Sequence, residues 1–582
     1  MKNTTIKLIC SVLFALNSFF LFSQESEKLP KGFTEKEKQL LTNFQFRNAQ
    51  VTTPPAGSVR AAAEWEEVEY LVLSWQTSFQ NILRQIVAVG VNECKVIIAT
   101  QSQATVASYL TSFGIDLTNV IFLNVPANSI WIRDYAGNTV YSDEVGQRGL
   151  TDWIYNRPRP NDNVMPTAHA NYVGIPIYVT DSGLTDLVNT GGNYMSDGLG
   201  NAFASELILE ENAVGNPYGV SAKTETQIDG IMQNYMGIQH YIKMPTLPFD
   251  EIHHIDMHMK LLDEETLLVS KYPPNVADGP QIESNINYVV NNFQSPFGTP
   301  YKIKWIDVPA STSGSYPDTG GAYRTFANSV FINKSILIPI YRPQVDAAAL
   351  ALYQQLLPGY NVVGIDVDNS GENLISQLGA LHCITHTIGV ADPLLIVHQP
   401  IKEANAGSTV TINAIVKHIS GIQTATVFWR EQGTATFNQT PLTFVSDSNW
   451  TTTISIPTSG LNIEYYIQGQ SVSGKTLARP IVAPTGYWTI NVSTLSTTDW
   501  ALQHISLPFP NPTKQNVNFE MNQMSGLINV SITNVLGQKL FSQTIQAGNG
   551  VFNLGLNPEW KGTLLVTFEG DFGTLTRKVV KL

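Results

Sequence analysis

Ser-Val-Phe-Ile-Asn-Lys-Ser-Ile-Leu-Ile-Pro-Ile at 329–340 is the stretch that decides the fold of this chain. Its two apolar runs flank Asn333-Lys334, a pair typical of a tight hairpin turn. Apolar residues at helical spacing follow from Val345 to Leu357, Pro358-Gly359 ends that pattern, and Asn361–Val367 returns as a strand. The stretch therefore predicts one unit of two antiparallel strands, a helix and a third strand.

The same order of elements recurs elsewhere in the chain. A second copy comprises Met257–Leu262, Glu265–Ser270, a polar helix near 281–293 and Tyr301–Val308. A third, less complete copy comprises Glu69–Ser74, a helix near 78–89 and Lys95–Thr100. Repeated units of this kind predict a closed, pseudo-symmetric α/β assembly over residues 61–394, with strand ends that converge on one axis.

After Pro393 the helical patterns stop. Residues 395–492 contain short alternating strands separated by Gly, Ser, Asn and Pro, which is typical of an immunoglobulin-like β-sandwich. A Ser/Thr-rich stretch at 493–504 predicts a linker, and residues 505–582 predict a further small β-domain.

The N-terminal residues carry export signals rather than fold signals. Residues 1–23 have two lysines, an apolar run and a small residue before Gln24, which predicts a secretory signal peptide. Residues 24–60 are polar and aperiodic, so we expect a flexible leader or propeptide, with Arg47 or Arg60 as the candidate cleavage points. No later stretch is long and apolar enough to span a bilayer, so the sequence predicts an exported protein with no transmembrane segment.

Charge narrows the possible partners. The net charge of −13 argues against nucleic acid or an anionic membrane, because basic clusters lead the binding of both. A cationic ligand would be attracted instead.

Two cysteines remain once Cys10 leaves with the signal peptide, too few for a disulfide framework. Cys94 precedes an apolar strand and is expected to be a buried small hydrophobe. Cys383, within Gly-Ala-Leu-His-Cys-Ile-Thr-His at 379–386, is the candidate nucleophile. A lone cysteine can also be a packing residue, and that alternative stays open.

A carboxylate pair and an imidazole accompany this thiol. Asp134 ends Trp-Ile-Arg-Asp at 131–134, while His254 and Asp256 stand two apart on a predicted strand and should share one face. In one pocket, the two carboxylates could bind the N–H groups of a guanidinium, and Trp131 could pack on its stem. Cys383 would then attack the central carbon, with His254 as acid and base, and convert arginine to citrulline.

Three alternatives compete with that interpretation. Arg133 and Asp134 could form a structural ion pair. Asp256 with His254 and His258 could bind a metal, although alternate residues of a strand lie in a row rather than around one ion. His382 and His386 could be the partners of Cys383 in place of His254. His382, however, is next to Cys383 in the sequence, and on a strand it would face the opposite way.

Six motifs occur in the order typical of the agmatine deiminase-like guanidino-group-modifying enzymes: Glu64-Trp65-Glu66, Trp131–Asp134, Gly191-Gly192-Asn193, His254-Ile255-Asp256, Phe326–Ser329 and His382–Thr385. Within that superfamily, residues 60–490 most closely resemble the secreted Porphyromonas-type peptidylarginine deiminases. The resemblance implies a five-bladed α/β propeller (pentein) with the active site on its axis, followed by an immunoglobulin-like domain. It also implies the catalytic roles given above, with Asn328 orienting the site, no cofactor, no catalytic metal and no calcium requirement.

Tyr155-Asn156-Arg157-Pro158-Arg159 bears on the choice of substrate. Pro158 fixes an extended backbone that sends Arg157 and Arg159 toward one side, although a solvated basic loop is the plain alternative. In the family, arginines here resemble a clamp for the carboxylate of a C-terminal arginine. Ile252 is expected to line the same end of the substrate site, and Glu251 stands where an aromatic residue is expected, so its charge could repel that carboxylate.

The last domain also has a counterpart. Pro510-Asn511-Pro512, Val530–Asn534 and Lys578–Lys581 resemble the C-terminal sorting domains of type IX secretion in Bacteroidota. This resemblance implies contact with the secretion machinery and a protein that is released or attached to the cell surface. Together the sequence predicts a secreted deiminase of peptide or protein arginine. A deiminase of agmatine or free arginine, and a non-catalytic arginine-binding surface protein, are the alternatives.

Overall fold

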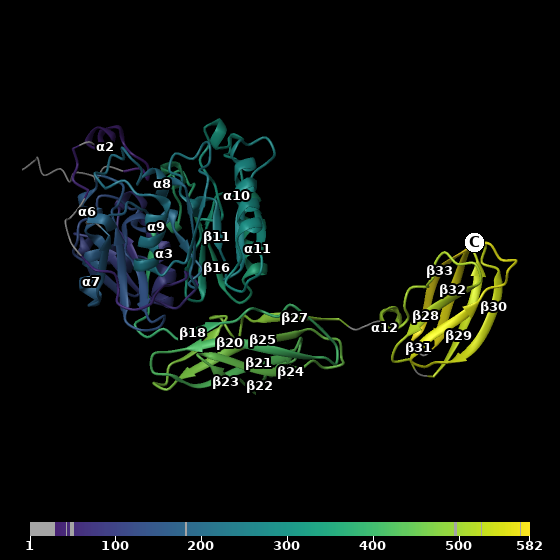
Figure 1. Cartoon of the computed structure of the whole chain (residues 1–582). Coiled ribbons are helices and arrows are strands. Elements are labelled where there is room, and N and C mark those ends of the chain that lie inside the picture. Colours follow the sequence, from purple (N-terminus) through teal and green to yellow (C-terminus); the bar gives the residue numbers. More distant parts are fainter. Residues whose placement is uncertain are drawn as a thin grey trace, which may run out of the picture.

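A computed structural model describes residues 29–41, 43–46, 52–180, 183–493, 497–524, 526–570 and 572–582. Figure 1 shows an α/β body drawn in purple to teal, a green β-sandwich beneath it and a separate yellow β-domain at the C-terminus. The predicted signal peptide and Arg47 lie outside the described residues.

The α/β body contains five small sheets among the residues described. Their strands, in spatial order, are β1 (Val59–Ala61), β5 (Asn138–Ser142), β6 (Arg148–Trp153) and β7 (Ile177–Thr180); β10 (His240–Met244), β9 (Asn201–Ser205) and β8 (Met195–Ser196); β11 (Met259–Leu261), β12 (Thr266–Lys271) and β13 (Lys302–Asp307); β14 (Val330–Ile332), β15 (Ser335–Ile340) and β16 (Asn361–Asp366); and β17 (His386–Gly389), β2 (Val68–Ser74), β3 (Lys95–Ala99) and β4 (Val120–Leu123).

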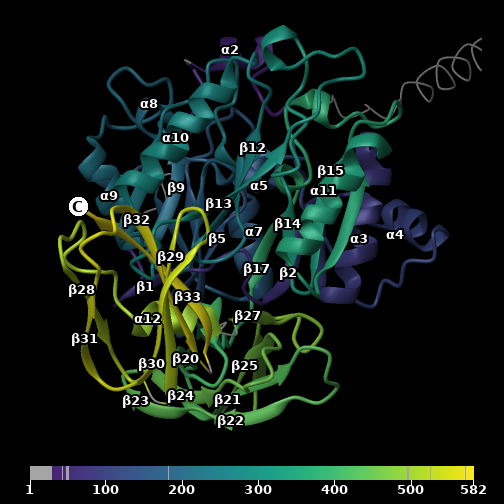
Figure 2. The same cartoon turned by 90° about the vertical axis from the view of Figure 1, so that its right-hand side faces the viewer.

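The helices that connect and cover these strands are α3 (Gln80–Glu93), α4 (Gln103–Ser112), α5 (Ile132–Tyr135), α6 (Pro160–Asn163), α7 (Met165–Val173), α8 (Leu207–Glu210), α9 (Glu225–Met236), α10 (Asp278–Asn292) and α11 (Pro343–Leu356). Figure 2 shows α10 and α11 next to the strands that they connect.

Each sheet is built on the predicted unit. In the unit formed by residues 329–367, β14 pairs antiparallel with β15 through a turn at Asn333, whose φ is +49°. Asn tolerates this left-handed conformation better than most residues. The chain then crosses through α11, and β16 pairs parallel with β15, with Ser335 opposite Asn361. The antiparallel pair followed by a parallel strand also occurs in the other four sheets.

The structure does not confirm the closed five-bladed propeller. β17, near the end of the body, pairs with β2 at its start, but strand pairing does not continue from one sheet to the next among the described residues. The result is a mixed α/β fold of separate sheets with a β-rich C-terminal region. The repeats predicted the pairing inside each unit, because turn and crossover chemistry is local; closure depends on packing between units, which the repeats do not encode.

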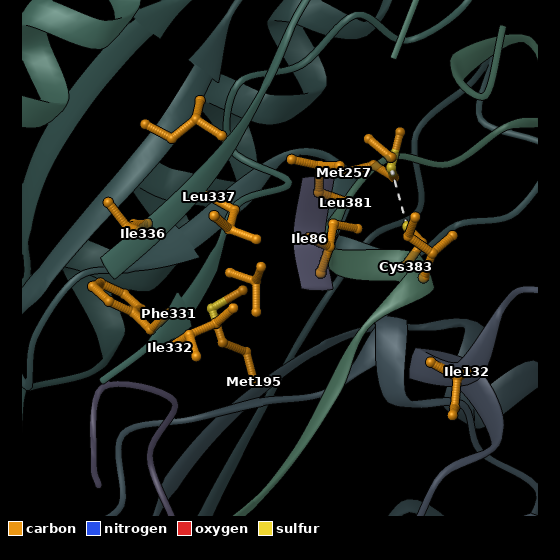
Figure 3. Packing of buried hydrophobic residues seen from close by; sticks show 14 of the residues in the cluster. Ile86, Ile132, Met195, Met257, Phe331, Ile332, Ile336, Leu337, Leu381 and Cys383 are labelled. Atoms are coloured by element: carbon orange, nitrogen blue, oxygen red, sulfur yellow. Dashed lines mark hydrogen bonds between the residues drawn. The ribbon is translucent and has the colours of Figure 1, made fainter. Parts of the chain in front are cut away.

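One hydrophobic core joins all five of these sheets, and Cys383 lies in it. Leu71, Ile97, Leu268, Leu337 and Cys383 are all fully buried in this cluster. Figure 3 shows Met257, Leu381 and Cys383 close together, with Sδ of Met257 3.8 Å from Sγ of Cys383. The thiol therefore borders apolar packing on one side, which restricts water around it. Cys94 precedes strand β3, as predicted, and lies half-buried at the C-terminal end of α3.

The predicted flexible leader is bound to the α/β body. Residues 29–41 and 43–46, which we call the docked segment, include helix α2 (Glu35–Leu40), visible at the top of Figures 1 and 2. Arg60, a candidate cleavage point, is buried in β1 and donates two hydrogen bonds to Glu66. A protease could not reach Arg60 in this structure, so that part of the leader prediction is wrong.

The green sandwich packs two sheets around its own hydrophobic core. One sheet contains β18 (Leu395–Val397), β20 (Thr409–Lys417), β24 (Asn449–Ser455) and β23 (Thr443–Ser446); the other contains β19 (Glu403–Asn405), β27 (Trp488–Ser493), β25 (Ile463–Ser471), β21 (Ile422–Glu431) and β22 (Asn438–Pro441), with β26 (Thr476–Arg479) on β25. Arg479 holds the sandwich to the α/β body by bonds of 3.1 and 3.2 Å to Glu264.

The C-terminal body begins earlier than predicted. Residues 497–504, expected to belong to the linker, form α12 (Thr497–His504), and Ala501 is buried in the core of this body. One of its sheets contains β28 (Asn516–Met521) and β31 (Gly550–Gly555). The other contains, in spatial order, β30 (Lys539–Gln546), β29 (Leu527–Asn534), β32 (Gly562–Gly570) and β33 (Gly573–Lys581). Within the described part of the chain, no helix is long and apolar enough to cross a membrane.

Gly486 tests the contact between the sandwich and the α/β body. A Cβ at Gly486 would lie 2.2 Å from the carbonyl oxygen of Pro358, a backbone atom that cannot easily move. We expect Gly486→Ala to lower the unfolding free energy by about 1–3 kcal/mol, as overpacking usually does. Thermal unfolding measures the change. Gly230→Ala is the control, because its new Cβ meets nothing within 4 Å; an equal melting temperature in both variants would contradict the prediction.

Candidate active site

Four predicted site residues come together from three short helical turns. Asp134 lies on α5, Cys383 on the 3-10 turn His382–Ile384, and Asp256 on the 3-10 turn Ile255–Met257, which His254 directly precedes. The side chains of all four are buried. The structure thus places the thiol, the imidazole and both carboxylates in one enclosed region.

Cys383 is surrounded by polar groups on the side opposite to Met257. Its Sγ lies 3.5 Å from Oδ2 of Asp256 and 3.2 Å from Nδ2 of Asn328. Asn328 is tied to both turns, since its Nδ2 donates to the carbonyl oxygen of Asp256 at 3.1 Å and its Oδ1 accepts from the His382 amide at 3.0 Å. Asn328 therefore fixes the thiol relative to the carboxylate.

The backbone before His254 is strained. His253 has a φ of +60°, an unfavourable conformation for a residue with a Cβ, and its carbonyl oxygen accepts a 2.5 Å hydrogen bond from Ser205. This conformation turns the chain so that Nδ1 of His254 lies 3.4 Å from Oδ1 of Asp134, while Nε2 lies 2.9 Å from the Thr190 hydroxyl. Burial and the Lys31 cation lower the pKa of His254. The imidazole is thus neutral near pH 7.

Gly192 makes this approach possible. A Cβ at this position would lie 2.5 Å from Nδ1 of His254 and 2.8 Å from Oδ1 of Asp134. Glycine is consequently required here to bring the acid and the imidazole together, which gives a physical reason for the Gly191-Gly192-Asn193 motif.

A second layer of charges supports Asp256. Nδ1 of His382 lies 2.8 Å from Oδ2 of Asp256, and Nε2 of His382 lies 2.5 Å from Oε1 of Glu64. Glu64 also pairs with Lys260 and, at 3.4 Å, with Arg133. Burial alone would raise the pKa of Glu64, but His382, Lys260 and Arg133 hold it well below its usual value. The network keeps Asp256 oriented toward the thiol.

The end of a lysine side chain occupies the centre of the site. Nζ of Lys31, from the docked segment, lies 2.9 Å from Sγ of Cys383 and 3.6 Å from Oδ1 of Asp256. Its side chain is fully buried. Burial lowers the pKa of Lys31, but the charges of Asp134 and Asp256 and the hydrogen bond to Cys383 outweigh burial and raise that pKa above its ordinary value, so the ammonium stays charged.

The carboxylates still have unused hydrogen-bonding capacity. Oδ1 of Asp134 and Oδ1 of Asp256 accept no hydrogen bond from the described residues, and the 3.6 Å from Asp256 to Nζ of Lys31 is too long for one. Both carboxyl pKa values are nevertheless low: burial raises them, and Lys31 is the largest influence that lowers them. Such a pair suits a cation with more N–H donors than an ammonium, which a guanidinium is.

Burial dominates the protonation of the thiol. Burial and the charge of Asp256 raise the pKa of Cys383 to about 12, although Lys31 acts in the opposite direction. A nearby cation therefore favours the thiolate, as expected, but in this state it does not offset burial. The thiol is protonated near neutral pH while Lys31 occupies the site.

Arg157 and Arg159 lie together on one side, as predicted, and both contact the docked segment. Nε of Arg157 donates to the carbonyl oxygen of Lys31 at 3.1 Å. Nη2 of Arg159 donates to the carbonyl oxygens of Pro30 and Gly32, at 2.7 and 3.1 Å. These contacts are made to peptide backbone. Both arginines are buried, so the alternative of a solvated basic loop is wrong.

The other predicted binding residues are placed less uniformly. Trp131 is fully buried and donates from Nε1 to the carbonyl oxygen of Leu29 at 2.9 Å. Ile252 is buried and Glu251 is exposed, and both line a surface pocket next to Arg157 and Phe33. Glu251 thus lies in the same pocket as Arg157, where its charge bears on any anionic substrate end.

Two local predictions were wrong, the strand assignment and the direction of His382. His254 and Asp256 lie at a 3-10 turn and not on a strand, and Cys383 also lies on such a turn. His382 therefore does not face away from Cys383, because both side chains contact Oδ2 of Asp256, His382 at 2.8 Å and Cys383 at 3.5 Å. His258 bonds Asp250 at 2.9 Å instead of sharing a metal with Asp256, and the described residues contain no group of three His, Cys, Asp or Glu side chains that could hold a metal ion.

Sequence reasoning missed Lys31 as a site residue. One signal was present: Thr34 and Glu37 form a capping box, which marks the start of a helix and argues against a flexible leader. Nothing in the sequence indicates that Lys31 reaches Cys383, 352 residues away. Glu64 and His382 each belong to a sequence motif, but the bond between them forms only in the tertiary structure.

The closed site predicts a protected thiol. We expect iodoacetamide at pH 7.5 to leave Cys383 unmodified in the folded chain, because the thiol is fully buried and its pKa is about 12. Mass spectrometry of tryptic peptides measures the labelling, and the urea-unfolded chain, in which Cys383 should react, is the control. Rapid labelling of Cys383 in the folded chain would contradict the burial described here.

Comparison with known proteins adds the family context. The profile of the Porphyromonas-type peptidyl-arginine deiminase family matches residues 60–388, and that of the secretion system C-terminal sorting domain matches residues 508–582. An agmatine deiminase of Pseudomonas syringae pv. tomato is 22% identical over 373 residues, which are 57% of this chain and 96% of that protein.

Two solved structures of agmatine deiminases align with this chain. The C. jejuni agmatine deiminase is 21% identical, with a TM-score of 0.47 over 57% of this chain and 96% of that one. The agmatine deiminase of Enterococcus faecalis is 15% identical, with a TM-score of 0.47 over 58% of this chain and 99% of that one.

Proposed function

The chain belongs to the Porphyromonas-type peptidyl-arginine deiminase family, and from this premise we propose that it hydrolyses the guanidinium of arginine in peptides or proteins to citrulline and ammonia. Membership makes it a deiminase-family hydrolase that acts on guanidino C–N bonds. Its sorting domain marks it as a protein that is secreted or attached to the cell surface. The peptide substrate and the residue roles below are our proposal.

One observation supports this function best. The thiol of Cys383 lies beside two buried carboxylates that keep low pKa values and hold a cationic side-chain end 2.9 Å from sulfur. A guanidinium bound there would place its electrophilic carbon near the thiol, and its N–H groups could fill the open positions on Asp134 and Asp256.

We propose that Cys383 is the nucleophile. His254 would take the proton of the thiol as the sulfur bonds to the central guanidinium carbon. It would then give this proton to the nitrogen that leaves that carbon as ammonia. The remaining thiouronium would be attacked by water, with His254 taking the proton, and the C–S bond would break to release citrulline and regenerate the thiol. The neutral, buried His254 is suited to accept a proton in this cycle.

The other predicted residues would position the substrate. Asp134 and Asp256 would anchor the guanidinium nitrogens, and Asn328, which contacts Cys383 and ties together its turn and that of Asp256, would orient the reacting atoms. Each of these residues acts by fixing a distance, which is how enzymes convert binding into rate.

A peptide is favoured over agmatine by the two arginines. Agmatine has no carbonyl or carboxylate next to its side chain, so Arg157 would have no partner at the position where it now donates to the Lys31 carbonyl oxygen. A C-terminal arginine would present a carboxylate there, and a charge-assisted bond is stronger than a bond to a neutral carbonyl. We therefore propose a preference for C-terminal arginine.

Replacement of the thiol separates catalysis from binding. We expect Cys383→Ala to abolish citrulline formation, detected by mass spectrometry as a gain of about one mass unit per converted arginine, because no other group replaces the sulfur. Cys94→Ala is the matched control, since it removes the other described thiol, which lies half-buried at the C-terminal end of α3 and is not a proposed site residue. Citrulline formation by the Cys383→Ala variant would show that another residue is the nucleophile. A wild-type chain that binds arginyl peptides without any turnover would favour a non-catalytic binding protein.

Replacement of Arg157 tests the substrate preference. We expect Arg157→Ala to lower kcat/KM at least tenfold for a peptide that ends in arginine, less for internal arginine, and least for agmatine. The ratios of the three kcat/KM values are compared within each variant, because these ratios do not depend on what fraction of the enzyme molecules is accessible to substrate. The control is Arg84→Ala, which removes a comparable arginine packed on a phenyl ring, Phe113. Equal losses for all three substrates would remove the proposed clamp.

A further inference from the structure

The site is filled by a part of the same chain, and the chain passes through it. The carbonyl oxygens of the successive residues 29–32 accept hydrogen bonds from Trp131, Arg157 and Arg159, and Nζ of Lys31 contacts the thiol. Lys31 N also donates to the carbonyl oxygen of Gln377 at 3.1 Å. The docked segment therefore contacts the site as a bound peptide does, with backbone bonds on both sides of one inserted side chain.

The Lys31 ammonium stands in for a guanidinium nitrogen. It provides one positive charge between Asp256, Asp134 and Cys383, as an arginine would, but it has no carbon that a thiol can attack. A lysine in this position can therefore bind the pocket and cannot be converted. It also satisfies only part of the site, since the two Oδ1 atoms remain without hydrogen bonds from described residues.

The docked segment is anchored outside the pocket as well. Nε of Arg159 donates to Oε1 of Glu37 at 2.7 Å, and both side chains are buried. The pKa of Glu37 is lowered: burial raises it, and the bond to Arg159 more than compensates. Phe33 lies 4.1 Å from the guanidinium of Arg157, and the ring of Phe46 packs on Tyr218 at 5.1 Å.

While these contacts persist, the site is inaccessible. The side chains of Cys383 and His254 are fully buried, and Asp134 and Asp256 are exposed by only 2% each. Arg157 and Arg159, which a peptide substrate would need, are both engaged by the docked segment. A substrate and the docked segment cannot bind at the same time.

We propose that the docked segment is a tethered pseudosubstrate: Lys31 takes the place of the target arginine, and the enzyme is latent until this segment leaves the site. This inference rests on the proposed deiminase function and adds its regulation and its peptide-binding mode. It also assigns backbone-binding roles to Trp131, Arg157 and Arg159. It implies that the site admits an internal arginine in addition to the preferred C-terminal arginine.

Exchange of the lysine for arginine tests the register directly. In the full chain, Lys31→Arg places a guanidinium where the ammonium lies, so we expect conversion of position 31 to citrulline, seen as a gain of about one mass unit in the peptide that contains it. The reaction is intramolecular, and its rate should not change with protein concentration. The double variant Lys31→Arg/Cys383→Ala should remain unmodified at position 31.

Release of the segment tests latency. We expect the full-chain variant Lys31→Ala/Glu37→Ala, which loses the ammonium and the buried partner of Arg159, to turn over an added arginyl peptide at least tenfold faster than the wild type. It should also expose Cys383 to iodoacetamide at least tenfold faster. Glu35→Ala/Lys38→Ala is the matched control, because it removes two exposed charges from the same helix and should change neither rate.

The outcomes separate the two proposals. If added peptide is converted equally by the wild type and by Lys31→Ala/Glu37→Ala, or if position 31 of Lys31→Arg stays unmodified in an active enzyme, the pseudosubstrate proposal is overturned and the deiminase remains. If no variant converts any substrate, the deiminase function fails. In that case labelling of Cys383 decides: faster labelling of the double alanine variant supports occupation of the site by the segment, and unchanged labelling overturns it.

Discussion

Two carboxylates buried away from water require a cation between them, and this constraint organises the centre of the protein. Asp134 and Asp256 are almost completely enclosed and keep low pKa values, chiefly because Lys31 lies beside them. An isolated buried charge would be costly and would be neutralised by proton uptake. A site of this design selects a cationic side-chain end, whether from a substrate or from the chain itself.

The surrounding structure holds those charges in place by short, rigid connections. Cys383, Asp134 and Asp256 lie on turns of three or four residues, and Asn328 bonds two of these turns at once. The strained His253 and the absence of a side chain at Gly192 bring His254 to Asp134. Local strain of this kind persists only where the neighbouring packing compensates it, which is common at functional sites.

The domains divide the tasks of the chain. The α/β body carries all proposed site residues, while the sandwich is fixed to it by the buried pair Arg479 and Glu264 and contributes none of them. The sorting domain forms its own core with α12 and carries the export signal. The docked segment is the part of the N-terminal region that contacts the proposed site, so the segment that we propose to restrain the enzyme and the sorting domain lie toward opposite ends of the chain.

Local chemistry was predictable from the sequence. Hairpin turns such as Asn333-Lys334, helix ends such as Pro358-Gly359 and the repeated unit they form depend on nearby residues, and the structure confirms the unit. Composition and motif order also determined which residues could carry the chemistry and that the chain has sorting signals at its C-terminus. These properties need only the covalent order of the chain and the conformational preferences of single residues.

Only the tertiary structure decided how those parts meet. The sequence could not show that His382 bonds both Asp256 and Glu64, that the sheets stay separate, or that Lys31 reaches a thiol 352 residues away. Each of these contacts joins segments that are distant in sequence, and the free energy that selects them comes from burial and charge compensation in the assembled core. No local pattern encodes that free energy. Only the folded chain therefore shows that part of the predicted leader binds at the proposed site.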